Sequence, residues 1–178
     1  MRIIGGRLKG RAILPPVGYK ARPTTDFARE ALFNILDNEY EFEDLKVLDL
    51  FGGTGAISYE FASRGVGRVY CVEMSRDNAS FIIREARRFG LDNITVVRDN
   101  VFDFLDVCYE KFDIIFADPP YDIDGLETIP DKVLGRDILH AGCYFILEHG
   151  PGHDFSSHPF FFKERAYGKV HFTFFKKD

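Results

Sequence analysis

The sequence contains no apolar run long enough to span a membrane, and it contains few cysteines. A transmembrane helix needs about 20 consecutive apolar residues, and no stretch of this 178-residue chain has that length. Arg2 is followed by glycines and not by an apolar stretch, so we expect no signal peptide. Cys71, Cys108 and Cys143 are odd in number and widely spaced. Such spacing excludes a disulfide framework and is typical of reduced core thiols in a cytoplasmic protein.

Repeats, low-complexity tracts and interdomain linkers are also absent from the sequence. With 178 residues, of which 46% are hydrophobic, the chain fits one domain with a sizeable core. Three histidines, His149, His153 and His158, match no standard ligand spacing, and glycine and proline between them indicate a loop. We therefore predict no metal site.

The chain has no excess of positive charge. Its net charge is −5, which by itself argues against a nucleic-acid partner. The distribution of charge matters more than the sum. Residues 1–30 carry seven basic and two acidic side chains, a net charge of +5, so the remainder carries −10. A basic arm on an acidic body is consistent with contacts to RNA phosphates, for which we name Arg7, Lys9, Arg11 and Arg22. A solvated hairpin with ordinary basic edge residues is the equally open alternative.

The most informative feature that is present is the tetrapeptide Asp118-Pro119-Pro120-Tyr121, directly after the buried-strand pattern of residues 112–117. Each proline favours an extended residue before it and lacks an N–H, so the backbone carbonyls here stay free to accept hydrogen bonds. Asp118 adds a carboxylate acceptor, and Tyr121 adds a ring face for stacking. This combination suits a site that holds a planar amino group while it is attacked. The alternative is a proline-stiffened turn with a surface tyrosine.

A glycine loop, Phe51-Gly52-Gly53-Thr54-Gly55, follows the strand pattern of residues 47–50. A helical pattern comes next, and a strand at residues 69–72 then ends in Glu73. Strand, glycine turn and helix form the first unit of a doubly wound fold. Glu73 lies 20 residues after Gly53, the spacing expected of a carboxylate that binds ribose hydroxyls. The sequence therefore predicts an adenosine-containing cofactor.

The loop is too short for the usual dinucleotide turn, and the chain has no G-x-x-x-x-G-K-[ST] phosphate loop. A short loop suits a ligand without phosphates, such as S-adenosylmethionine. Asp99 follows a strand pattern at residues 94–97 and is placed to reach the adenine amino group, with a helix N-cap as its alternative role. The predicted cofactor residues are Asp49, Gly52, Gly53, Thr54, Gly55, Glu73, Met74, Asp99 and Asn100.

The order of these motifs resembles that of the class I amino-methyltransferases. The opening of the chain resembles the bacterial RsmD-type family in particular. The segments concerned are Arg2-Ile3-Ile4-Gly5-Gly6, Lys9-Gly10-Arg11, and Arg22-Pro23-Thr24-Thr25-Asp26 running into Arg29-Glu30-Ala31-Leu32-Phe33-Asn34. The resemblance covers nearly the whole chain. It departs at Phe27, where the family often has a basic residue, and this removes one candidate phosphate contact.

The resemblance implies an S-adenosylmethionine-dependent methyltransferase that acts on N2 of a guanine in small-subunit (16S) ribosomal RNA. Its catalytic residues would be Asp118, Pro119, Pro120 and Tyr121. The implied partner is ribosomal RNA or the small subunit, and we expect a cytoplasmic monomer with no membrane association. One alternative is an adenine-N6 methyltransferase of DNA or RNA, although 178 residues leave little room for a target-recognition region. The other is a non-catalytic RNA-binding or assembly factor, which would not need intact site residues.

We predict an α/β fold with a doubly wound, mostly parallel seven-stranded sheet that contains one antiparallel strand. A small N-terminal β-hairpin would precede it, so that residues 1–23 form a basic arm and residues 24–178 a methyltransferase domain. Helices are predicted at residues 26–38 and from Ser75, as N-cap, to Phe89, with Gly90 as the stop. Further strands are predicted near residues 3–4, 12–14, 144–147, 160–162 and 170–175.

Overall fold

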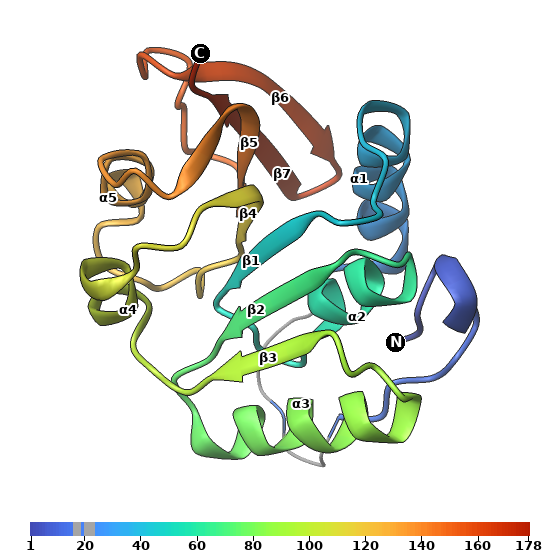
Figure 1. Ribbon diagram of the computed structural model, residues 1–178. Helices are drawn as coiled ribbons and strands as arrows, with labels where there is room; N and C mark the ends of the chain where they lie inside the picture. The colour runs from blue at the N-terminus through green and yellow to red at the C-terminus, as the bar shows by residue number, and fades with distance from the viewer. Residues whose placement is uncertain (16–18, 20–23) are drawn as a thin grey trace.

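A seven-stranded sheet forms the centre of the computed structural model, which describes residues 1–15, 19 and 24–178. The strand order is β3-β2-β1-β4-β5-β7-β6 (Figure 1). Only β7 runs against its neighbours, β5 and β6, so the predicted mostly parallel sheet with one antiparallel strand is confirmed. The strands are β1 Lys46–Leu50, β2 Arg68–Val72, β3 Ile94–Val97, β4 Phe112–Ala117, β5 Leu139–His149, β6 Phe161–Tyr167 and β7 Val170–Lys176.

Helices cover both faces of the sheet and enclose two separate cores. Apolar residues of α1 (Asp26–Glu39), α2 (Ala56–Ser63) and α3 (Arg76–Phe89) pack on one face. Those of α4 (Val101–Val107) and α5 (Ile129–Leu134) pack on the other. Successive side chains of a strand point to opposite faces. This alternation explains why β4 is apolar from residue 114 to residue 117: Ile114 and Phe116 join the first core, and Ile115 and Ala117 join the second.

The helix ends follow local capping chemistry. Thr25 caps α1 by accepting the Ala28 N–H at 3.1 Å, and Ser75 caps α3 as predicted. Gly90 ends α3 in the left-handed conformation, with φ of 63°, which glycine adopts without strain. The N-cap of α4 is Asn100, whose side chain accepts the Phe102 N–H at 2.8 Å. The alternative role that we gave to Asp99 is therefore wrong, because the capping residue is one position later.

The N-terminal arm folds back on itself, but it does not form the two strands that we predicted near residues 3–4 and 12–14. A single antiparallel bridge joins Arg2 to Ala12, and a 3-10 helix, η1 (Gly6–Leu8), makes the turn. The N–H groups of Ile4 and Gly5 donate to the buried carboxylate of Glu60 in α2. Because α2 takes these donors, they are not available for a β-ladder.

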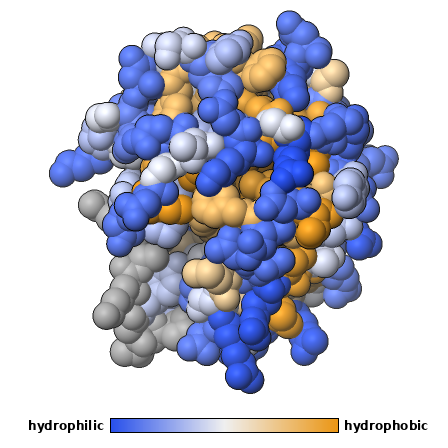
Figure 2. Space-filling view, turned by 90° about the vertical axis from the view of Figure 1, so that its left-hand side faces the viewer, coloured by the Kyte–Doolittle hydropathy of each residue, from blue (hydrophilic) through white to orange (hydrophobic). Residues whose placement is uncertain are grey.

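The topology gathers the loops after β1, β2, β3, β4 and β5 at the carboxyl edge of the sheet. In doubly wound folds this edge is where ligands bind. Figure 2 shows the side of the molecule toward which the arrows of β2 and β3 point, where hydrophobic residues reach the surface between hydrophilic ones. In the part of the chain that is described, no helix is long and apolar enough to cross a membrane. Cys71 is buried as predicted, whereas Cys108 and Cys143 are only partly buried, and all three are free thiols.

Candidate active site

The glycine loop leaves β1 in a conformation that few other residues would tolerate. Phe51 has φ of 63°, and Gly53 and Gly55 have φ of 58° and 81°, all in the left-handed region. A Cβ atom on Gly52 would lie 2.4 Å from the Cys71 Sγ atom of β2. The loop therefore approaches the end of β2 very closely, and the Gly52 N–H donates to the Val72 carbonyl at 2.9 Å.

Glu73 is fixed by backbone donors on both sides of its carboxylate. Its Oε2 accepts the Gly53 N–H at 2.7 Å, and its Oε1 accepts the Ser75 N–H at 2.7 Å. The side chain is almost fully buried. Glu73 therefore contacts the glycine loop directly, and its carboxylate has a fixed orientation at the end of β2.

Asp49, near the end of β1, lies beneath this loop. Its Oδ2 accepts a hydrogen bond from the Ser58 hydroxyl at 2.6 Å, and the side chain is buried. Burial raises the pKa of Asp49 to about 7, although the hydrogen bond from Ser58 opposes this shift. Asp49 is thus a buried residue beneath the glycine loop, held in place by Ser58. Thr54 is also buried, and its hydroxyl lies 3.8 Å from the Met1 sulfur.

The remaining predicted cofactor residues lie beside the ends of β2 and β3. Met74 is exposed, and the Asn100 amide lies 3.8 Å from its sulfur. Asp99 is partly buried and accepts the Asn100 N–H at 2.9 Å. These three side chains lie at the carboxyl edge of the sheet, on the same side of the glycine loop as Glu73.

The acidic tetrapeptide follows β4, next to the glycine loop. The Asp118 N–H points to the Leu50 carbonyl at 3.4 Å, so the turn continues the pairing of β4 with β1. Pro119 is buried and Pro120 is exposed. Burial, followed by the charges of Glu148 and Asp49, raises the pKa of Asp118 well above its ordinary value. The Tyr121 side chain is 55% exposed, and its ring would lie 3.4 Å from a Cβ atom added to Gly150.

Three residues that the site predictions omitted also lie at this edge. Thr24 donates from its hydroxyl to Glu148 Oε2 at 2.7 Å, and burial raises the pKa of Glu148 to about 7. Tyr19 lies close above the loop, because a Cβ on Gly53 would be 2.9 Å from its hydroxyl. Burial, then the charges of Glu73 and Asp118, raises the pKa of Tyr19 to about 12. The only sequence signal for Glu148 was its position at a strand end.

The predicted phosphate contacts lie far from this cluster. Arg7 donates to the Gly90 carbonyl at 2.5 Å, at the C-terminal end of α3, and Lys9 and Arg11 are exposed on the same arm. Figure 1 shows the arm on the side of the sheet away from the arrowheads of β2 and β3. Arg22 lies outside the described residues. Phe27 is exposed, with its ring centroid 5.9 Å from that of Tyr167.

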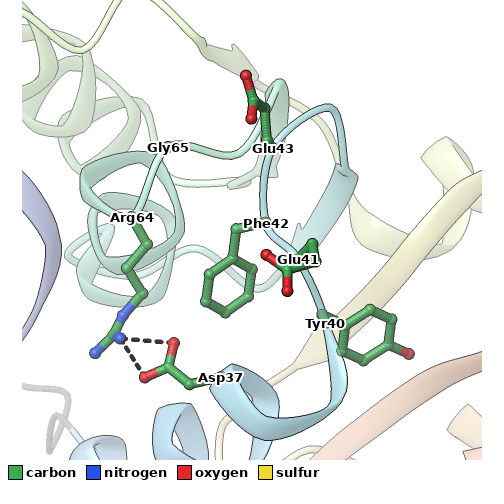
Figure 3. A pocket seen from close by; sticks show the side chains of 7 residues that line it. All are labelled: Asp37, Tyr40, Glu41, Phe42, Glu43, Arg64 and Gly65. Atoms are coloured by element: carbon green, nitrogen blue, oxygen red, sulfur yellow. Dashed lines mark hydrogen bonds and ion pairs between the residues drawn. The ribbon is translucent and has the colours of Figure 1, made fainter.

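Two further features do not belong to the site. Among residues 1–15, 19 and 24–178, no group of three or more His, Cys, Asp and Glu side chains could hold a metal ion. A pocket of about 550 Å³ opens at the C-terminal ends of α1 and α2, where Arg64 pairs with Asp37 (Figure 3). Its other lining residues are Tyr40, Glu41, Phe42, Glu43 and Gly65. None of them comes from the motifs of the carboxyl edge, so this pocket lies apart from the site.

Comparison with known proteins adds a family and a set of relatives. A family model described as Conserved hypothetical protein 95 matches residues 1–176. The chain is 36% identical over 121 residues, 68% of its length, to ribosomal RNA small subunit methyltransferase D of Escherichia coli (strain K12). It is 34% identical over 122 residues, also 68% of its length, to the protein of the same name from Buchnera aphidicola subsp. Baizongia pistaciae. The matches span 60% and 61% of these two relatives.

The likeness to solved structures extends over the whole fold. A hypothetical protein from Thermus thermophilus superimposes with a TM-score of 0.88 at 31% identity, covering 99% of both chains. The predicted fold is thus found in a related chain over its full length.

Proposed function

This chain belongs to the family Conserved hypothetical protein 95, the RsmD-type family that its motifs predicted, and we propose that it methylates N2 of a guanine in small-subunit ribosomal RNA. We place it in the cytoplasm as a monomer that acts on ribosomal RNA or on the small subunit. The single observation that carries the proposal is the junction of three motifs at one edge: the glycine loop, Glu73 and the Asp118 turn.

The donor set at the loop fits S-adenosylmethionine. Glu73 presents a buried, oriented carboxylate for ribose hydroxyls, and the absence of a side chain at Gly53 lets the Tyr19 hydroxyl lie directly beside the loop. Asp99 and Asn100 would border the adenine end of the cofactor. When bound, this cofactor supplies an electrophilic methyl group on a positively charged sulfur. No phosphate group has to be accommodated, in agreement with the short loop.

The Asp118 turn would activate the target amine. An exocyclic nitrogen is a poor nucleophile because its lone pair is delocalised into the ring. Hydrogen bonds from the amine to the Asp118 carboxylate and the Pro119 carbonyl would favour a tetrahedral nitrogen and aim its lone pair at the methyl group. The same acceptors stabilise the positive charge that develops on nitrogen. The exposed Tyr121 ring would stack on the flipped-out base.

The basic arm would hold RNA by its phosphates. Residues 1–30 carry a net charge of +5 on a chain of net charge −5. Lys9 and Arg11 present exposed side chains, whereas Arg7 is partly engaged with Gly90. Arg22 directly precedes Pro23 and Thr24 and belongs to this proposed set by sequence alone.

The decisive experiment is mass spectrometry of nucleosides from 16S ribosomal RNA of cells with and without the protein. We expect N2-methylguanosine to decrease when the protein is absent. Wild-type protein should restore it, and Asp118→Ala should not. A loss of N6-methyladenosine in its place would contradict the guanine assignment. Unchanged nucleosides together with undetectable S-adenosylmethionine binding by calorimetry would favour a non-catalytic RNA-binding factor.

A further inference from the structure

Two aromatic side chains, Phe27 and Tyr167, meet at the carboxyl edge of the sheet, and we call them the aromatic pair. Phe27 lies in the first turn of α1, three residues after Thr24, whose hydroxyl donates to Glu148 at the end of β5. Tyr167 is the last residue of β6, which ends beside α1 (Figure 1). The two ring centroids are 5.9 Å apart, and the ring planes are nearly perpendicular, at 81°. The pair therefore lies on the same edge as Asp118, which is level with Glu148.

The strand register sets the distance between the aromatic pair and the proposed target site. His171 of β7 pairs with His149 at the end of β5 and with Ala166 at the end of β6. The two strands therefore end level with each other, two strand spacings or about 10 Å apart. The Tyr121 ring, which we expect to stack on the target base, lies against Gly150, directly after β5. One RNA strand can thus reach both the Tyr121 ring and the aromatic pair.

The exposed ring of the pair is supported by a chain of packed rings. Phe27 is 68% exposed, and a single exposed apolar side chain is by itself ordinary on a protein surface. Here, however, Tyr167 also packs on Phe172 at 6.1 Å, and Phe172 packs on Phe116 at 6.4 Å. Both of these phenylalanines are fully buried, as is Arg29, two residues after Phe27 in α1. The Phe27 ring is therefore held against the core while most of it is open to solvent.

Charges of both signs surround the aromatic pair. Asp26 forms ion pairs with Arg2 at 3.3 Å and with Arg29 at 2.6 Å. Arg165 is exposed and lies two residues before the end of β6, so it is on the same face of the sheet as the pair. Glu30, also exposed, lies one helical turn after the pair's residue in α1 and opposes these cations. This mixture does not favour a purely ionic phosphate site, whereas an aromatic ring can stack on the face of any nucleobase.

Base flipping supplies an occupant for the aromatic pair. An enzyme that acts on a base of RNA takes that base out of its stack, so the neighbouring base loses a stacking partner. Unpaired bases of RNA are recognised largely by stacking on aromatic side chains. We propose that Phe27, supported by Tyr167, stacks on an unpaired base next to the target guanine and so selects RNA in which that nucleotide is single-stranded. This inference rests on the proposed methyltransferase function and adds a second stacking contact to that of Tyr121.

The chain contains no tryptophan, which allows a test without methyl transfer. Phe27→Trp places the only indole of the protein at this position, and a nucleobase that stacks on the indole should quench its fluorescence. Titration with a single-stranded oligoadenylate should therefore quench the emission, because stacking tolerates any base. An RNA duplex of the same length and inorganic polyphosphate should quench much less, since their phosphates come without unpaired bases.

Phe162→Trp is the matched control. Phe162 is 49% exposed and lies at the other end of β6 from Tyr167. Its indole should respond to single-stranded RNA no more than to polyphosphate. Equal quenching of the two indoles by the oligoadenylate would overturn the inference, and so would equal quenching of Phe27→Trp by polyphosphate. An emission of Phe27→Trp that shifts with protein concentration alone would assign the ring to a contact between copies of this chain, and would also overturn it.

The second test measures methyl transfer to 16S ribosomal RNA. Phe27→Ala should raise the KM for RNA by roughly 5- to 150-fold, the range expected for one lost stack between a base and an aromatic ring. The KM for S-adenosylmethionine and the kcat at saturating RNA should change little. Phe27→Trp and Phe162→Ala should keep the wild-type KM for RNA. A wild-type KM in Phe27→Ala, or a fall in kcat alone, would show a purely structural role and overturn the inference.

The two tests also separate this inference from the proposed function. If wild type transferred no methyl group while single-stranded RNA quenched Phe27→Trp, the proposed function would fail and the base contact would stand. If wild type methylated the RNA while the indole at position 27 was not quenched, the function would stand and the base contact would be overturned.

Discussion

At the scale of single residues, Glu73 would connect the proposed cofactor binding to the conformation of the glycine loop. Its two oxygens hold the Gly53 and Ser75 N–H groups, so it serves the loop and the proposed ribose contact together. Removing the carboxylate should therefore weaken binding through a lost charge-assisted hydrogen bond and through a looser loop.

Glu73→Ala should reduce the affinity for S-adenosylmethionine by about 1–3 kcal/mol, and Glu73→Gln by less, because an amide oxygen still accepts one of the N–H groups. Isothermal titration calorimetry on folded variants measures the affinity for S-adenosylmethionine. Glu43→Ala, on the exposed turn before β1, is the matched control. Equal affinities for wild type and Glu73→Ala would remove Glu73 from the cofactor site.

Substitutions at Asp118 and Tyr121 distinguish the methyl-transfer step from cofactor binding. Asp118→Ala should abolish methyl transfer while the cofactor affinity changes only a few-fold, because the proposed partner of Asp118 is the target amine. Tyr121→Ala should lose most activity, whereas Tyr121→Phe should keep much of it if the ring acts by stacking. Single-turnover assays together with cofactor calorimetry provide both readouts. A Tyr121→Phe variant as inactive as Tyr121→Ala would show that the hydroxyl matters and that stacking is not the main role.

Some of these residues could be identified from the sequence and others could not. Asp118, Gly52 and Glu73 lie in local patterns of strand, turn and acid, which depend on fewer than about 25 residues of chain. The contact between Thr24 and Glu148 joins residues 124 apart, and neither has a neighbouring motif that points to the other. Tyr19 comes close to Gly53 although the two residues are 34 positions apart in the chain. Contacts of this kind depend on tertiary structure, which local patterns do not encode.

At the scale of elements, predictions succeeded where a cap sets the boundary. Thr25, Ser75 and Gly90 define the ends of α1 and α3 by hydrogen bonds or backbone conformation within a few residues. The arm was the exception, because its N–H groups of Ile4 and Gly5 bond to Glu60 and not to a second strand. A side chain about 55 residues away overrode the local strand preference.

Glu60 is therefore expected to fasten the arm to α2. Glu60→Ala leaves two backbone donors without their acceptor and removes the charge beside Arg64. The free energy of unfolding should fall by about 3 kcal/mol, measured by urea denaturation. Trypsin should also cut faster after Arg7, Lys9 or Arg11 in the native variant. Glu41→Ala, on the surface, should change neither quantity. Wild-type stability with unchanged cleavage in Glu60→Ala would show that the arm is held by its apolar contacts alone.

At the scale of the whole molecule, the arm and the carboxyl edge lie at opposite ends of α3. That helix has 14 residues and is about 20 Å long, with Ser75 at one end and Gly90, bonded to Arg7, at the other. RNA that reached both the arm and the Asp118 turn would have to span about this length, which a folded ribosomal RNA segment does easily. We therefore keep residues 1–23 apart from a catalytic domain only as a proposal about RNA binding. In packing, the arm belongs to the domain, because Ile3, Leu8 and Ile13 join the core of α2 and α3.

Salt dependence tests whether the arm binds phosphates. Each neutralised phosphate contact releases about one condensed counterion, so Arg7→Gln, Lys9→Gln and Arg11→Gln combined should flatten the log-log salt slope by roughly two to three units. Arg7 should contribute least, because its guanidinium already donates to the Gly90 carbonyl. Cofactor affinity should stay at the wild-type value, since the arm cations lie at the far end of α3.

The matched control removes three exposed cations outside the arm and keeps the same net charge as the arm variant; it combines Lys111→Gln, Lys132→Gln and Lys169→Gln. RNA binding by filter retention at several salt concentrations would compare the three proteins. If the arm variant and the control variant had the same slope, the general charge of the protein, and not the arm, would account for RNA affinity.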